Sequence, residues 1–315
     1  MKNISRREAI KVGTAAAISC IGTSARAAKA KSKNKTEPTI GLSTLGFHSY
    51  TNKQLAEELQ REGIKVIQLF LIQMDSRYWK YNGRSDLSTL SAKRCAEIAD
   101  TYRSEGVDIH SIGVYTNLIH PDANERKANL EYFEGMMKVG DDMGVKIFIT
   151  ETGHHHPEKP EPGLAYHFRE DVWNNMVETG KELAEMAEHH KAKVLYEPYY
   201  NGFLASAKRT KVFLEEIDSP RVRALLDPAN ILELNDLEEM FGQLSGRIDC
   251  LHAKDRKLHV AQGVPAGQGD LDYIKFVELA GKYCPDAPFI LEYVGPKDYK
   301  QAIAILQKAI NQQGG

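Results

Sequence analysis

The sequence predicts an α/β protein folded as a single-domain (β/α)8 TIM barrel over residues 39–315. Three observations support this prediction. Apolar, β-branched segments typical of strands buried on both faces alternate eight times with amphipathic segments typical of helices. Four of the apolar segments end in residues that can bind a metal, as expected where strand ends converge on one rim of a barrel. Several connections from strand to helix are long, which gathers loop residues on that same rim.

In the first half of the barrel, each expected strand is an apolar segment, and helical spacing of apolar residues marks the helices. Asn52 is a favourable N-cap for the first helix, and Val172, Met176 and Leu183 are spaced to share one face of the fourth. A loop rich in aromatic residues follows the second strand. In order, strand before helix in each pair, the expected elements are 40–46, 52–61, 66–71, 91–104, 109–116, 125–142, 146–152 and 170–190.

In the second half, four buried strands are expected in the segments KVLYEPYYN, VRALLDPAN, IDCLHAKDRK and FILEYVG. The helices that follow them are expected near 206–216, 236–243, 271–281 and 297–311. The long strand-to-helix connections are 72–90, 153–169 and 255–270, whereas helix-to-strand connections such as 62–65 are short. An open doubly wound sheet would require a Gly-rich phosphate-binding turn after its first strand, and the segment GLSTLGFHSY provides none. The pattern therefore favours the barrel.

The four C-terminal strands end in Glu197, Asp227, His252 and Glu292. Any one of these could be an ordinary polar residue at a strand end, but four on consecutive strands indicate a shared site. Two Glu, one Asp and one His form a hard, oxygen-rich ligand set that suits one divalent metal. We expect Mn²⁺ first, with Mg²⁺, Co²⁺ or Zn²⁺ as alternatives. Four protein ligands leave one or two positions for substrate oxygens, as a catalytic site requires.

The segments YEP, LDPAN, HAKD and LEY, which contain these four residues, resemble those of the sugar phosphate isomerase/epimerase family. This family, which includes ketose 3-epimerases, is part of the xylose-isomerase-like TIM-barrel superfamily. The resemblance covers the chain after about Thr39, and GQGDLD at 267–272 is similar to the turn that opens the seventh helix. It implies that Glu197, Asp227, His252 and Glu292 bind one metal.

The resemblance also implies a reaction. Glu197 and Glu292 would act as a catalytic acid/base pair on opposite faces of a sugar. One would remove a proton next to a carbonyl to give an enediolate, and the other would return it, so that the sugar is isomerised or epimerised. A small-molecule carbohydrate is therefore the expected partner, and the resemblance also implies a homodimer.

Five further residues are candidates for binding the substrate. Asn230 stands where many epimerases of this family have His, and Lys254 can stabilise an enolate oxygen or a substrate hydroxyl or lie solvated on the rim. The histidines 154–156 follow the fourth strand and either extend the site or belong to a solvated loop. His110 lies at the start of its strand, on the opposite rim, and is expected to be structural. The complete set of substrate-binding candidates is His48, Glu151, His154, Asn230 and Lys254.

Other functions are compatible with a barrel that carries these candidate residues. If the substrate is a 3-keto glycoside, proton abstraction at C2 expels the C1 substituent and makes the protein a lyase. A non-catalytic periplasmic sugar-binding protein would not need the acid/base pair. Endonuclease IV, which shares the superfamily, requires His ligands after the second and third strands, and the segments 69–71 and 113–115 contain none. Residues 28–315 hold 36 of the 41 basic and 42 of the 43 acidic residues, an acidic balance that excludes a nucleic-acid partner.

The N-terminus is expected to be a targeting segment. Residues 1–27 contain Arg6-Arg7, a short apolar stretch and the cleavage pattern Ala25-Arg26-Ala27. They resemble a twin-arginine export signal, although Ala9 stands where that family usually has an aromatic residue. The expected location is the periplasm, and a lipoprotein anchored at Cys20 is the alternative. Residues 28–38 are expected to be a disordered, lysine-rich linker, and no other segment is long enough to span a membrane.

The remaining cysteines, Cys95, Cys250 and Cys284, show no CxxC spacing and are odd in number. Neither a disulfide framework nor a thiolate zinc site is therefore expected. We interpret all three as inert thiols of the hydrophobic core.

Overall fold

The computed structural model describes residues 37–154 and 165–313. The expected export signal at 1–27, most of the expected linker, and His155 and His156 lie outside the described residues. The three elements expected between residues 40 and 71 and the helix at 91–104 are all found within one or a few residues of their expected bounds.

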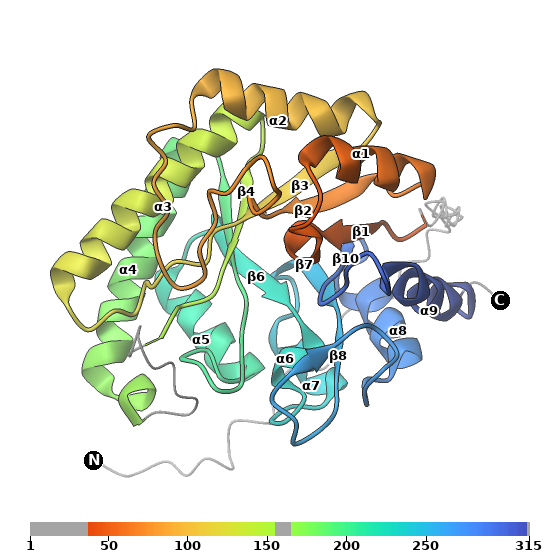
Figure 1. The fold of residues 1–315 in the computed structure, drawn as a ribbon. Helices are drawn as coiled ribbons and strands as arrows, with labels where there is room; N and C mark the ends of the chain where they lie inside the picture. Colours follow the sequence, from red (N-terminus) through yellow and green to blue (C-terminus); the bar gives the residue numbers. More distant parts are fainter. Residues whose placement is uncertain (1–36, 155–164, 314–315) are drawn as a thin grey trace, which may run out of the picture. The chain divides into compact units, whose positions relative to one another are not determined.

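Eight parallel strands close into a barrel, in the order β1-β10-β7-β6-β5-β4-β3-β2, which confirms the expected fold class (Figure 1). Each strand is three to six residues long, and pairing runs round the full circle because β1 contacts both β2 and β10. The strands are β1 (Ile40–Ser43), β2 (Val66–Leu69), β3 (Asp108–Gly113), β4 (Ile147–Thr150), β5 (Lys193–Tyr196), β6 (Val222–Leu226), β7 (Ile248–Ala253) and β10 (Phe289–Leu291).

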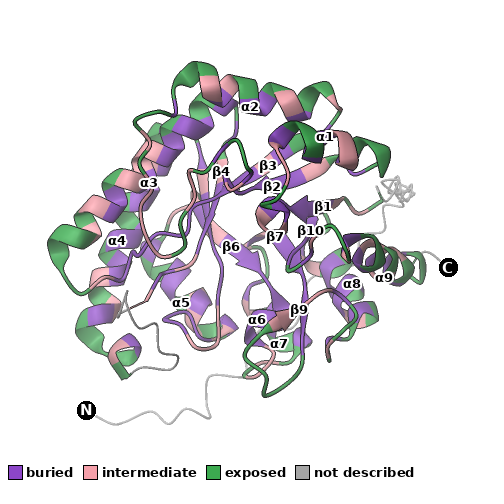
Figure 2. Ribbon diagram, viewed as in Figure 1, coloured by how far each residue is buried: buried purple, intermediate pink, exposed green. Residues whose placement is uncertain are grey.

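Helices surround the strands, with their buried faces turned inward and their exposed faces outward (Figure 2). Most of them begin at a Ser, Thr or Asp side chain that accepts a hydrogen bond from the first turn. The helices are α1 (Asn52–Arg61), α2 (Ala92–Ser104), α3 (Ala123–Met143), α4 (Glu170–His189), α5 (Ala207–Ile217), α7 (Leu237–Gln243), α8 (Tyr273–Tyr283) and α9 (Tyr299–Asn311).

Two details of the first unit differ from expectation. The N-cap of α1 is Thr51, not Asn52, because Thr51 and Gln54 form a reciprocal capping box and Asn52 becomes the first helical residue. The first strand also ends at Ser43 instead of continuing to residue 46. Ser43 caps a short 3-10 helix, η1 (Thr44–Phe47), so the chain turns away from the sheet early.

A helical turn and a short two-stranded hairpin are among the elements that were not expected. Residues Pro228–Ile231 form a single helical turn, α6, capped by the Asp227 side chain. Within the long connection after β7, β8 (Asp255–Arg256) pairs in antiparallel fashion with β9 (Gly263–Val264). Both lie on the same rim of the barrel as the carboxyl ends of β6 and β7.

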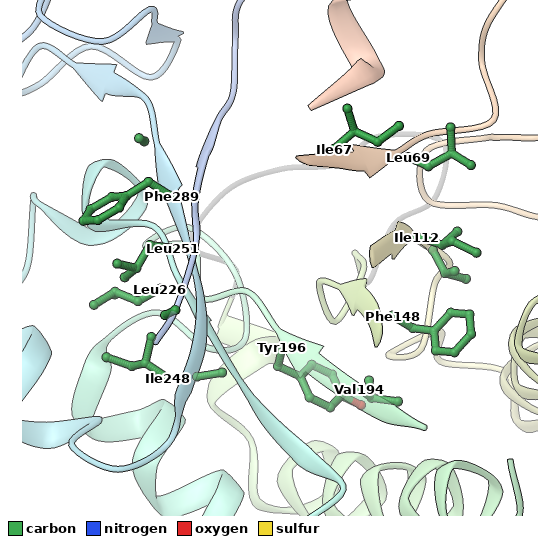
Figure 3. Packing of buried hydrophobic residues seen from close by; sticks show 14 of the residues in the cluster. Ile67, Leu69, Ile112, Phe148, Val194, Tyr196, Leu226, Ile248, Leu251 and Phe289 are labelled. Carbon is green, nitrogen blue, oxygen red and sulfur yellow. The ribbon is translucent and has the colours of Figure 1, made fainter. Parts of the chain in front are cut away.

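The hydrophobic core has two layers, one between strands and helices and one inside the barrel. Figure 3 shows strand residues of the outer layer, among them Phe148, Tyr196, Leu226 and Phe289. The inner layer is a separate cluster that takes residues from neighbouring strands: Phe70, Tyr115, Ile149, Leu195, Leu225, Cys250 and Ile290. Side chains alternate between the two layers along each strand, as the period of two requires.

Candidate metal centre and active site

The alternation of side chains brings the expected ligands to one place. Leu195, Leu225, Cys250 and Ile290 point into the barrel, so the residues two positions later also point inward, at the carboxyl ends of their strands. Those residues are Glu197, Asp227, His252 and Glu292. The same rule, counted from Ile149, turns Glu151 toward the interior. β5, β6, β7 and β10 are neighbours in the barrel, so the four strand ends are adjacent.

One ligand atom from each of Glu197, Asp227, His252 and Glu292 lies within 4.8 Å of the others, and all four residues are buried. Nδ1 of His252 is the common neighbour. It lies 3.1 Å from Glu197 Oε1, 3.5 Å from Glu292 Oε2 and 3.9 Å from Asp227 Oδ2. The structure therefore brings together the complete ligand set expected from the sequence.

The arrangement fits a bound divalent cation. Asp227 Oδ1 accepts a hydrogen bond from the main chain of Ala229, but the buried Oδ2 accepts no aligned hydrogen bond. Three carboxylates gathered in a dry site repel one another unless positive charge lies between them. A cation bound by these oxygens and by His252 Nδ1 would coordinate Oδ2 of Asp227 and balance the negative charge of the cluster.

Without a metal, the charges of the cluster are balanced by protons and by Lys254. Burial raises the pKa of Asp227 to about 6. Burial also opposes ionisation of Glu197, but the charge and hydrogen bond of His252 outweigh it and lower the pKa of Glu197 to about 2. For His252, burial is outweighed by the neighbouring Glu292 and Glu197, which raise the pKa of the imidazole to about 9. The same kind of attraction, chiefly to Asp227 and Glu292, holds the pKa of Lys254 well above its ordinary value despite burial.

Two of the expected substrate-binding residues contact the ligand cluster directly. Asn230, in α6, donates a hydrogen bond from Nδ2 to Glu197 Oε1 at 2.7 Å. Lys254, two residues after His252, lies 2.9 Å from Glu292 Oε2 and 3.0 Å from Asp227 Oδ2. Both residues are buried and line the cavity described below.

Two residues that contact the cluster were not expected from the sequence. Tyr115, after β3, donates a hydrogen bond to Glu197 Oε2 at 2.7 Å. Gln68, in β2, places Oε1 2.6 Å from His252 Nε2 across the barrel. This contact assigns the Nε2 proton to the side facing Gln68 and turns Nδ1 toward the carboxylates. In the metal-free protein the protonated Nδ1 donates to Glu197, and on deprotonation its lone pair would be available to a metal. The sequence offered one signal for Gln68, which is the single polar residue of the otherwise apolar strand β2.

Above the cluster lies a cavity of about 500 Å³. Its volume lies within the ~300–1,000 Å³ range of small-molecule sites. The lining combines aromatic and charged side chains and includes Phe70, Trp79, Tyr81, Tyr115, Glu151, His154, Glu197, Asn230, Lys254, Arg256, Glu292 and Tyr293. Within this lining the ring centres of Phe70 and Trp79 are 5.3 Å apart, and those of Phe70 and Tyr115 are 5.5 Å apart.

The remaining expected residues lie in different places. Glu151 and His154 line the cavity and share the hydroxyl of Tyr81, which lies 2.8 Å from Glu151 Oε2 and 2.9 Å from His154 Nε2. His48 is exposed at the end of η1 and does not line this cavity, because the early turn after Ser43 carries it outward. His110 lines a second cavity with Asp249 near the amino ends of the strands, which is the rim on which the sequence placed it.

The sequence of residues 53–309 matches the model of a protein family described as the xylose isomerase-like TIM barrel. The chain belongs to the xylose isomerase-like TIM barrel family. The match covers 257 of the 315 residues, which include all four candidate ligands. This family assignment agrees with the closed barrel and with the position of the site on its C-terminal rim. No curated protein sequence matches the chain.

Solved structures of the xylose isomerase-like kind share the fold at low sequence identity. A D-tagatose 3-epimerase-like protein superimposes with a TM-score of 0.71 at 16% identity, covering 88% of this chain and all of its own. The 3-keto-D-glucoside 4-epimerase YcjR from E. coli gives 0.66 at 15%, covering 86% of this chain and 99% of its own. The IOLI protein with a bound zinc atom gives 0.67 at 16%, covering 87% and 97%. Among the helices of the described ranges, none has the length and apolar character needed to cross a membrane.

Proposed function

We propose that the protein is a divalent-metal-dependent sugar isomerase or epimerase that acts by proton transfer next to a carbonyl. The observation that carries this proposal is the buried group of Glu197, Asp227, His252 and Glu292 at the floor of a cavity of sugar-binding size. The epimerases among the similar structures support the same class of reaction.

The four residues would hold the metal, which supplies Lewis-acid polarisation of a carbonyl or hydroxyl oxygen when bound. Glu197 and Glu292 then divide the proton transfers, one removing the proton from the carbon and the other returning it. Tyr115 and Asn230 orient Glu197 by donating to its two oxygens. Lys254 offers a positive charge to a developing enolate oxygen.

Deuterium incorporation from solvent tests the proposal. The Mn²⁺-loaded protein is incubated with free ketoses and with 3-keto glucosides in D₂O, and the products are followed by NMR. We expect deuterium at a carbon next to a carbonyl, and loss of this exchange by about 10²–10⁴-fold in Glu197→Gln and Glu292→Gln, the range typical of general acid–base groups. Near-normal exchange in either variant would contradict the assigned roles. Absence of exchange with stoichiometric metal bound would indicate a sugar-binding protein.

A second candidate is a 3-keto-glycoside lyase that uses the same metal and Glu pair. The observation that favours it is the Tyr81–Glu151–His154 group, a hydrogen-bonded set of titratable side chains on the cavity wall that isomerisation does not require. Release of an alcohol from a 3-keto glucoside, followed in the same NMR experiment, distinguishes the lyase from an epimerase.

We further propose that the N-terminal segment directs export to the periplasm. Replacing Arg6-Arg7 by Lys-Lys is expected to retain the protein in the cytoplasm, as cell fractionation would show. If Cys20→Ser releases a membrane-bound form instead, the lipoprotein alternative is correct.

A further inference from the structure

A fourth carboxyl group, that of Glu151, lies on the cavity wall and is separate from the three carboxylates among the candidate ligands. Glu151 follows β4, directly beside β5, which carries Glu197. Its Oε2 lies 2.8 Å from the hydroxyl of Tyr81, and the same hydroxyl lies 2.9 Å from Nε2 of His154. Two hydrogen bonds thus link an acid, a phenol and an imidazole, all of which line the cavity.

The surrounding loops hold this group in place. The main-chain N–H of His154 donates to Asn82 Oδ1, and Asn117 donates from Nδ2 to the His154 carbonyl at 2.8 Å. The preceding Gly153 has a φ of +86°, and a Cβ there would lie 2.5 Å from Asn117 Oδ1 and 2.7 Å from Asn117 Cα. A side chain does not fit at residue 153, so the chain packs tightly enough to fix His154 against Tyr81.

Epimerisation does not require the Glu151–Tyr81–His154 group. When one of Glu197 and Glu292 removes a proton and the other returns one, the transfers balance with two carboxyl groups. Elimination needs a proton at a different atom, the oxygen departing from C1, whereas Glu197 and Glu292 are assigned to the two faces of the reacting carbon. An acid elsewhere on the cavity wall can protonate that oxygen as it leaves. Burial, with the nearby charge of Glu197, raises the pKa of Glu151 to about 8, so that this carboxyl carries a proton at neutral pH.

The hydrogen bonds suit such a donor. Tyr81 donates to Oε2 of Glu151, while Oε1 accepts no hydrogen bond from the described residues and can carry the proton that faces a ligand. After the proton has left, the Tyr81 hydroxyl stabilises the remaining carboxylate. His154, which is half-buried, connects the group to solvent, from which the proton is replaced.

We propose that Glu151 is the acid that protonates the oxygen expelled from C1 of a 3-keto glycoside, with Tyr81 and His154 as its positioning residues. This inference rests on the lyase form of the proposed function and adds the leaving-group donor to it.

The proposed elimination is balanced in atoms and electrons. Glu197 or Glu292 takes the proton from C2, and that electron pair forms the enediolate. The pair then forms the C1–C2 double bond as the carbonyl at C3 is restored and the C1–O bond breaks. The departing oxygen keeps the electrons of that bond and takes the proton of Glu151. The products are an unsaturated 3-keto sugar and an alcohol, with no oxidant or reductant consumed.

The cavity has a suitable place for the departing group. The rings of Trp79 and Tyr81 lie 6.3 Å apart, and both rings lie 6.4 Å from Tyr115, forming a continuous aromatic surface beside Glu151. Such a surface binds the apolar face of a second sugar ring or an aromatic aglycone. The reacting sugar would then occupy the side near Glu292 and Lys254.

The test compares two leaving groups in one variant. Methyl and 4-nitrophenyl 3-keto-glucosides are given to the Mn²⁺-loaded wild-type protein and to Glu151→Gln. Methoxide is a poor leaving group and requires the acid, whereas nitrophenolate leaves without a proton. We expect Glu151→Gln to slow release of methanol by about 100-fold or more and release of nitrophenol by about fivefold or less, since positioned acids contribute about 10²–10⁴-fold. Tyr81→Phe should shift the same ratio in the same direction.

The control is Tyr199→Phe, because Tyr199 lines the same cavity but bonds through its hydroxyl to Asn201. Its ratio of the two rates should equal that of the wild type. Equal loss of both reactions in Glu151→Gln would overturn the inference, since a structural defect slows both alike. If the wild type neither exchanges deuterium nor releases either alcohol, the proposed function itself fails, which is a different outcome from an unchanged ratio.

Discussion

The ammonium group of Lys254 lies 2.9 Å from Glu292 Oε2, inside the group of residues that would bind a metal. The same nitrogen lies 3.0 Å from Asp227 Oδ2, so Lys254 and a metal would compete for two carboxylates. Lys254 is only 5% exposed, and its charge therefore acts at short range and with little screening.

Lys254→Met should consequently bind Mn²⁺ more tightly. Removing one positive charge beside the site increases the apparent affinity by about tenfold, as the Coulomb energy of a partly buried pair allows. Turnover should fall at the same time, because a developing enolate loses the positive charge of Lys254. Calorimetric titration measures the first effect and NMR assays the second. Lys257→Met, at an exposed position of the same segment, is the control; unchanged affinity in Lys254→Met would contradict the competition.

Gln68→Met should weaken metal binding by about 10–100-fold, the usual effect of losing the partner that orients a ligating histidine. The contact between Gln68 Oε1 and His252 Nε2 holds the imidazole in the tautomer that exposes Nδ1. Gln73→Met is a matched control, because Gln73 is equally buried but donates to the main chain of Thr44. Equal affinities in the two variants, measured by calorimetry, would show that Gln68 only fills space.

Metal affinity should increase with pH. In the metal-free protein the pKa of His252 is raised to about 9, so its imidazole carries a proton at neutral pH that a metal must displace. The apparent affinity should rise by about tenfold per pH unit below pH 9. Calorimetry at pH 7.5 in two buffers of different ionisation enthalpy should show about one proton released per Mn²⁺. No release at that pH would contradict the protonated His252.

Tyr115→Phe removes one of the hydrogen bonds that favour the charged form of Glu197, so the pKa of this carboxyl should rise. The acidic limb of the profile of kcat/KM against pH should move to higher pH. The free energy of unfolding should fall by about 1 kcal/mol, the usual value for one hydrogen bond. Tyr196→Phe offers a comparison, because the buried Tyr196 hydroxyl has no hydrogen-bond partner among the described residues. An identical profile in Tyr115→Phe and wild type would exclude the role.

The sequence was sufficient to predict the barrel and the convergence of the four candidate ligands, because both depend on local patterns. A few consecutive apolar residues are enough to indicate a buried strand. The period of two along each strand then turns Glu197, Asp227, His252 and Glu292 toward the interior of the barrel. The exact ends of the strands were harder to predict. The apolar residues after Ser43 belong to η1, since the choice depends on a cap hydrogen bond and not on hydrophobicity.

The residues that orient the ligands could not be predicted in the same way. Gln68 and His252 are 184 positions apart in the chain, and Tyr115 and Glu197 are 82 apart. Such pairs form only because the barrel closes, and nothing near Gln68 or Tyr115 in the sequence indicates a distant partner. The β8–β9 hairpin was also missed, because two residues per strand produce no periodic pattern.

The contact between Gln68 and His252 divides the site between the two halves of the chain. Every negatively charged ligand comes from strands after residue 190, but the tautomer of the single imidazole is set by β2, near the beginning of the barrel. A fragment containing only β5 to β10 would contain all four candidate ligands. It would still lack Gln68, which orients the His252 imidazole. Under the proposed function, tight metal binding would therefore require that β2 has already joined the strands that carry the candidate ligands.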